Sequence, residues 1–83
     1  MIENNNWYSP KEVADLHVIP GANNATTVRR RYFHDEKVQK KYKIIVKCYG
    51  EVERGKDEYE LCRYWIEGKQ LNRLIEDIKN GKL

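Results

Sequence analysis

Apolar and polar positions near the start of the chain follow the pattern of a short helix. Ser9 and Glu12 stand three residues apart around Pro10, which is the arrangement of a capping box with proline in the first helical position. Apolar residues at helical spacing follow as far as Leu16. This pattern predicts a helix from Pro10 to about Leu16.

A cluster of Pro, Gly and Asn at positions 20–24 interrupts this pattern and predicts a turn. We expect a second helix to begin at Ala25, with Asn23 or Asn24 as its N-cap. Its apolar face comprises Ala25, Val28, Tyr32 and Phe33. The spacing therefore predicts two helices separated by a turn.

Further along, residues 37–43 form a basic connection, and residues 42–53 are rich in the Ile, Val and Tyr typical of a strand. Residues 54–57 then predict a turn, and residues 58–66 a returning strand. A single register places apolar partners opposite one another, whereas a shift by one residue would set Val46 against Arg63. The expected pairs are Ile44 with Ile66, Val46 with Tyr64, and Cys48 with Cys62.

The chain closes with apolar residues at helical spacing after Gly68, and Gly81 marks the end of this predicted helix. We expect its apolar residues to pack in the core, because so small a domain needs the area. The fold class predicted is α+β: a winged helix-turn-helix with a two-stranded wing and a C-terminal helix. It forms a single domain over residues 1–83, of which residues 1–6 are expected to be a flexible N-terminus.

Composition narrows the classes of function. The chain has 83 residues, 40% hydrophobic and 35% charged, so we expect a folded domain too small for a deep catalytic cavity. No acid, base and nucleophile stand at a convincing spacing, and the sequence predicts neither an enzyme nor a metal or cofactor site. Without a membrane-spanning stretch or signal peptide, we expect a cytoplasmic protein, in which Cys48 and Cys62 are reduced.

Charge is concentrated in the middle of the chain. The net charge is only +3, yet residues 29–47 carry eight Lys or Arg against two acids. Such a block is typical of a contact with the phosphates of nucleic acid. A charged surface that merely interacts with solvent is the alternative.

Candidate DNA-contacting residues lie on the outward face of the second helix, on its flank at Arg29, and at the tip of the hairpin. In a helix-turn-helix, the N-terminal residues of the second helix enter the major groove, where Arg reads guanine. We expect the flanking arginines to bind the DNA backbone and the hairpin tip to enter the minor groove. The predicted contact residues are Thr26, Thr27, Arg29, Arg30, Arg31, His34, Arg54 and Lys56.

Two segments resemble known families of DNA-binding proteins. Residues 7–16 (WYSPKEVADL) resemble the opening of the N-terminal winged-helix domains of Mu-type phage transposases and repressors. Residues 26–30 (TTVRR) resemble the recognition helix of lambda-type phage excisionases and the wider MerR-like group, and residues 74–82 are similar in form to the excisionase tail, which engages the integrase. The resemblance implies that Arg29, Arg30 and the residues just before them contact DNA.

From these observations we expect a sequence-specific double-stranded DNA-binding accessory factor of a mobile element, excisionase-like, with an integrase or transposase as partner. A domain of this size buries only about 600–1,000 Å² on DNA, so cooperative self-association on adjacent sites is also expected. One alternative is a Mu-type transcriptional repressor. Another is a protein-interaction module that acts through the C-terminal amphipathic helix.

Overall fold

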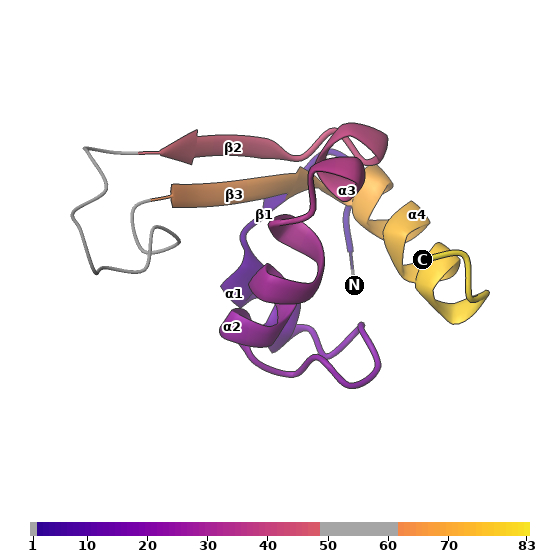
Figure 1. Ribbon diagram of the computed structural model, residues 1–83. Coiled ribbons are helices and arrows are strands. Elements are labelled where there is room, and N and C mark those ends of the chain that lie inside the picture. Colours follow the sequence, from indigo (N-terminus) through magenta and orange to yellow (C-terminus); the bar gives the residue numbers. More distant parts are fainter. Residues whose placement is uncertain (1, 49–61) are drawn as a thin grey trace.

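The sheet brings distant parts of the chain together (Figure 1). The computed structural model describes residues 2–48 and 62–83. Three antiparallel strands lie in the order β1-β3-β2, with β1 at Trp7–Tyr8, β2 at Ile45–Cys48 and β3 at Cys62–Glu67. The chain is therefore a small α+β domain. The prediction of two strands is wrong, because a third strand, β1, pairs with the end of β3. β1 is too short to show an alternating pattern in the sequence.

The register of β2 and β3 is the one predicted, but the ladder begins at Ile45 and does not include the expected pair of Ile44 with Ile66. Val46 pairs with Tyr64 and Cys48 with Cys62. Val46 is 39% exposed, whereas its partner Tyr64 is 6% exposed. The apolar face of the hairpin is therefore only partly buried. Cys48 and Cys62 form a disulfide, with Cα atoms 3.9 Å apart. The expectation of reduced cysteines is therefore wrong.

Helix α1, Pro10–Asp15, begins with the predicted capping box. The backbone N–H of Glu12 donates to Ser9 Oγ, and the backbone N–H of Ser9 donates to the Glu12 carboxylate, both over 3.3 Å. Val13 is fully buried on the inner side of the helix. The pattern of capping and apolar positions thus located this helix correctly.

Helix α2, Ala25–Val28, has Asn24 as its N-cap, which is one of the two residues predicted for that position. The helix then widens into a π turn, η1, over Arg29–Phe33, and the N–H of His34 donates to the carbonyl of Arg29 over 3.0 Å. A π turn holds one more residue than an α turn. Val28 and Phe33, five positions apart, are consequently both fully buried, whereas Tyr32 is only partly buried.

Helix α3, Glu36–Lys41, replaces the basic connection expected at residues 37–43. Asp35 caps it by accepting the N–H of Lys37 over 2.9 Å. Only Val38 is buried within this helix, so it has too little apolar periodicity to be recognised from sequence. The strand predicted from Tyr42 starts later, at Ile45, because Tyr42 terminates α3.

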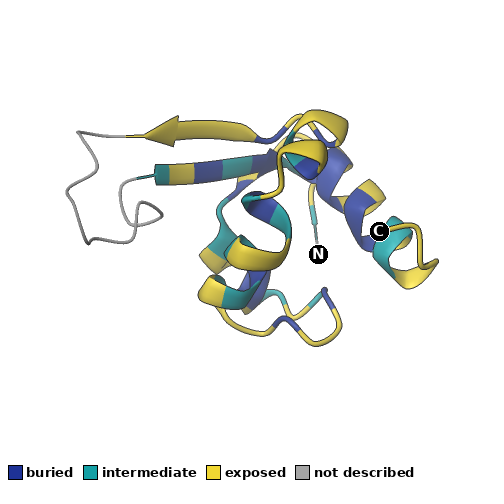
Figure 2. Cartoon of the chain, in the orientation of Figure 1, coloured by how far each residue is buried: buried dark blue, intermediate teal, exposed yellow. Residues whose placement is uncertain are grey.

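Helix α4, Gly68–Lys79, packs in the core as predicted. Leu71 and Leu74 are fully buried and Ile75 is 8% exposed. Gly81, with φ of +70°, follows the helix at the position expected for its end. Figure 2 shows the buried side of α4 turned toward the sheet.

The residues before β1, expected to be a loose N-terminus, cross the start of α4. The N–H of Gly68 donates to the carbonyl of Asn6 over 2.8 Å, and that of Lys69 to the carbonyl of Asn4 over 3.3 Å. These bonds satisfy two of the N–H groups that a helix start leaves unpaired. A Cβ on Gly68 would lie 1.8 Å from the carbonyl oxygen of Glu3, so this crossing needs glycine there.

One hydrophobic core joins all these elements except β2, whose four residues are exposed. Between η1 and the sheet, the rings of Phe33 and Tyr64 meet edge to face at 6.2 Å. None of the helices in the described parts of the chain is both long and apolar enough to cross a membrane. The buried apolar residues are Tyr8, Val13, Ala14, Ile19, Ala22, Val28, Phe33, Val38, Tyr42, Ile44, Tyr64, Ile66, Leu71, Leu74 and Ile75.

A polar link connects α3 to α4 at the opposite end from the hairpin. The Tyr42 hydroxyl donates to the Asp77 carboxylate, and Lys41 Nζ lies 3.4 Å from the same carboxylate. The hydrogen bond from Tyr42 lowers the pKa of Asp77, and the charge of Lys41 lowers it further. Burial raises the pKa of Tyr42, and its bond to Asp77 acts in the same direction.

Candidate nucleic-acid interface

Helices α1 and α2 lie below the sheet (Figure 1) and are joined by a connection at residues 16–24. The connection turns at Gly21, whose φ is +75°. Ile19 and Ala22 from this connection are each 1% exposed, so the turn is anchored in the core. One guanidinium N–H of Arg31 points to the carbonyl of Gly21 over 3.5 Å, a long contact between η1 and the turn.

The outward face of α2 and η1 carries most of the predicted contact residues. Thr26, Arg30 and Arg31 are exposed, and Thr27 is partly exposed. The backbone N–H of Thr27 donates to the Asn24 side chain over 2.8 Å, which holds the helix start in place. Because Val28 and Phe33 hold the back of this segment in the core, its front faces solvent.

His34 departs from the predicted outward position. It is partly buried, and its ring centroid lies 5.1 Å from that of Tyr64 on β3. The extra residue in the π turn shifts every position after Arg29 around the helix, which a constant 100° per residue did not anticipate. His34 therefore faces the sheet.

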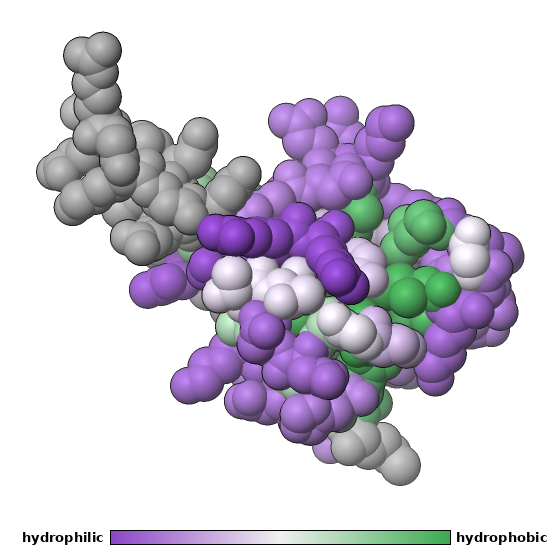
Figure 3. All heavy atoms as spheres, turned by 60° about the horizontal axis from the view of Figure 1, so that its bottom comes forward, coloured by the Kyte–Doolittle hydropathy of each residue, from purple (hydrophilic) through white to green (hydrophobic). Residues whose placement is uncertain are grey.

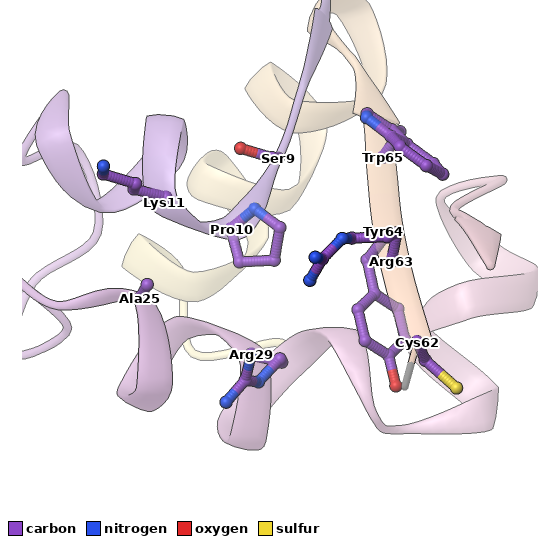
Figure 4. Close-up of a pocket in the computed structure, with 9 residues that line it drawn as sticks. All are labelled: Ser9, Pro10, Lys11, Ala25, Arg29, Cys62, Arg63, Tyr64 and Trp65. Carbon is purple, nitrogen blue, oxygen red and sulfur yellow. The ribbon is translucent and has the colours of Figure 1, made fainter. Parts of the chain in front are cut away.

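Arg29 lines a cleft of about 310 Å³ between the helices and β3 (Figure 4). The sequence placed Arg29 on the flank of the second helix, and the structure is consistent with that position. The two cations predicted at the hairpin tip, Arg54 and Lys56, lie outside the described residues. The cleft residues are Ser9, Pro10, Lys11, Ala25, Arg29, Cys62, Arg63, Tyr64 and Trp65.

Sequence reasoning missed Lys11 and Arg63, which are exposed cations on two other walls of this cleft. Lys11 lies in the first turn of α1, and Arg63 alternates with the buried Tyr64 along β3. The predicted hairpin register contained part of the signal, since it identified Tyr64 as inward-facing and its neighbour as outward-facing. How β3 lies against α1 depends on β1, which was not predicted.

The surface on this side is polar with an apolar flank. Figure 3 turns the lower side of Figure 1 toward the viewer, and the most hydrophilic side chains lie across the middle of that face. Among residues 2–48 and 62–83, no group of three or more His, Cys, Asp or Glu could hold a metal ion. The chemistry available on this face is that of cations, hydroxyls and a few aromatic rings.

No protein-family model, curated protein or solved structure gives a significant match to this chain.

Proposed function

We propose that this chain is a winged-helix protein that binds double-stranded DNA in a sequence-specific manner. Helices α1 and α2 with η1 serve as the helix-turn-helix, and the β2–β3 hairpin serves as the wing. The observation that carries the proposal is the position of Thr26 and Arg30, which are exposed on a helix whose opposite side is fixed in the core. A major groove accepts a helix presented in this way.

Each contact residue has a distinct chemical task in this proposal. Arg30 makes a bidentate contact with guanine, and Thr26 contacts a thymine methyl group or a phosphate at the helix start. Arg31, whose guanidinium points to the carbonyl of Gly21, binds the DNA backbone. Thr27 supports the helix start through its bond to Asn24. Base contacts give sequence preference, and backbone contacts give salt-dependent affinity.

The biological role that fits is an accessory factor of a mobile element, excisionase-like, acting with an integrase or transposase. This role rests on the resemblance of residues 7–16 and 26–30 to phage proteins. A Mu-type repressor shares the fold and the DNA-reading helix, and is the second candidate. In the interaction-module alternative, the apolar face of α4 binds a partner, yet Leu71 and Leu74 are fully buried.

A fluorescence titration tests the proposal with a mixed-sequence duplex at two salt concentrations. The wild type should bind with an affinity that falls steeply as salt rises, because bound phosphates release counterions. On a duplex that carries the sequence selected by the wild type, Arg30→Ala should weaken binding by about tenfold, the loss of one good base contact. Lys79→Ala, which removes an exposed cation from the last turn of α4, is the matched control and should bind like the wild type.

Absence of binding at low salt would overturn the proposal. So would equal losses for Arg30→Ala and Lys79→Ala, because binding would then depend on net charge rather than on the second helix. Circular dichroism of each variant establishes that the fold is retained.

A further inference from the structure

The cleft beside Arg29 exists because β3 is only partly paired on one side. β2 pairs with β3 from Cys62 to Trp65, whereas β1, on the other side, pairs only with Ile66 and Glu67. The remaining edge of β3 faces the start of α1 and the junction of α2 with η1 (Figure 4). The cleft thus lies where the helix-turn-helix and the hairpin meet.

Cations from three separate elements line this cleft: Lys11 from α1, Arg29 from η1 and Arg63 from β3. No Asp or Glu is among its lining residues in the described part of the chain. Two lysines with described ion pairs lie elsewhere: Lys41 pairs with Asp77 of α4, and Lys69 pairs with Glu67 of β3. The cleft therefore concentrates positive charge, and no described acidic side chain lines it.

Arg29 adds a second, independent observation. Its Nε atom is buried and has no hydrogen-bond partner within the described residues. A buried donor without a partner destabilises a protein, so the Arg29 side chain would gain from a small rotation that brings Nε to a ligand oxygen in the cleft. Arginine offers a planar set of donors that matches the oxygens of a phosphate group.

We propose that this cleft binds one phosphate of the DNA backbone, next to the bases read by α2. The inference rests on the proposed function, because it names the part of the DNA that the cleft binds. Arg29 and Arg63 bind the phosphate oxygens from the helix side and the hairpin side, and Lys11 adds charge at the rim. Pro10 and Trp65 supply apolar walls for the adjoining sugar. One bound phosphate thereby fixes the hairpin relative to the reading helix.

Salt-dependent titrations of Arg63→Ala test this assignment. Arg63 is exposed, so its removal should leave the fold intact. We expect affinity to fall by about fivefold to tenfold for every duplex sequence, and the slope of log affinity against log salt to become shallower by about 0.9. Arg63→Lys, which keeps the charge, should retain most of the slope.

A combined variant examines whether the two arginines share one phosphate. If they do, Arg29→Ala with Arg63→Ala should weaken binding by less than the product of the two single effects, because the second change affects a contact already lost. Effects that multiply would show separate phosphates and overturn the assignment. An unchanged affinity and slope in Arg63→Ala would overturn it too, while the proposed function would stand.

The NMR signal of the Arg29 Nε–H group distinguishes the sources of phosphate. It should shift when duplex DNA is added to the wild type, and the shift should be much reduced in Arg63→Ala. A shift with inorganic phosphate but no binding of DNA would overturn both the proposed function and the DNA assignment, and would identify a site for free phosphate. DNA binding without any shift of this signal would overturn the cleft assignment alone.

Discussion

The two ends of the domain differ in whether a carboxylate lies beside their cationic side chains. At the α3–α4 end, Lys41 contacts Asp77, which also accepts the hydroxyl of Tyr42. At the end where α1, η1 and β3 meet, Arg29 and Arg63 line a cleft without a described carboxylate. The first arrangement satisfies its charges within the protein. The second has no such partner among the described residues, and this contrast separates residues that stabilise the fold from residues that we propose to bind DNA.

The two ends also differ in how far the side chains of their helices are buried. Around α4, apolar residues are fully buried, and backbone N–H groups at its start are capped by residues of the N-terminus. On α2 and η1, Val28 and Phe33 are buried and the other side is exposed. Changes at the α4 end should therefore lower stability, whereas changes at the exposed face should alter binding at little cost in stability.

The largest effect is expected from Leu74→Ala. Leu74 is fully buried, and truncating a buried leucine leaves a cavity that lowers the free energy of unfolding by about 2–5 kcal/mol. Urea unfolding followed by circular dichroism measures this loss. Leu83→Ala, at a position 53% exposed, is the control and should change little. A stable Leu74→Ala protein would contradict the packing of α4 and restore the interaction-module alternative.

The disulfide should give the next largest effect. Cys48 and Cys62 are separated by 14 positions, and closing a loop of that size stabilises a fold by about 3 kcal/mol. Changing both to serine should lower the unfolding free energy by about that amount, and a reducing agent should have the same effect on the wild type only. Equal stability of the reduced and oxidised wild type would contradict a stabilising role for this bond.

Gly68→Ala should follow, despite the better helix propensity of alanine. The new Cβ would lie 1.8 Å from the carbonyl oxygen of Glu3, and a backbone atom has no rotamer to relieve the clash. We expect a loss of about 1–3 kcal/mol, as for other overpacked sites, measured by thermal unfolding. Lys69→Ala, the exposed neighbour, should stay near the wild type. A stabilised Gly68→Ala protein would show that the N-terminal residues do not cross α4.

The smallest effect concerns pH and Asp77. Because its pKa is lowered below the ordinary value of 3.8 in the fold, the ionised carboxylate stabilises the protein above that pH. This contribution is lost as pH falls through the lowered pKa. Asp77→Asn should therefore be less stable than the wild type near neutrality, and the difference should shrink below pH 3.8. Glu76→Gln, at the exposed neighbouring position, is the matched control.

Local sequence signals predicted most of the helices well. Ser9, Pro10 and Glu12 located α1, and the Asn pair before Ala25 located α2, because caps are encoded by neighbouring residues. The hairpin register also followed from alternation alone. Two short elements were not predicted. Strand β1 has two residues, and helix α3 buries one apolar side chain within its span. Neither offers enough positions for a period to be visible.

The candidate site was only partly predictable for a similar reason. The exposed positions of Thr26 and Arg30 follow from helical spacing, but the π turn at η1 moved His34 toward β3. Lys11 and Arg63 join the cleft through packing between elements far apart in sequence. The cysteine prediction failed in another way: the register placed the two residues opposite each other, and an expectation about the cell compartment overrode that geometry.

Selection of bound sequences from a random duplex library tests the central claim most directly. The wild type should enrich a defined motif containing a guanine, and Arg30→Ala should lose preference at one base pair of that motif while Arg63→Ala keeps the motif at lower affinity. Enrichment of no motif, or of the same motif by wild type and Arg30→Ala, would contradict the reading of DNA by the second helix.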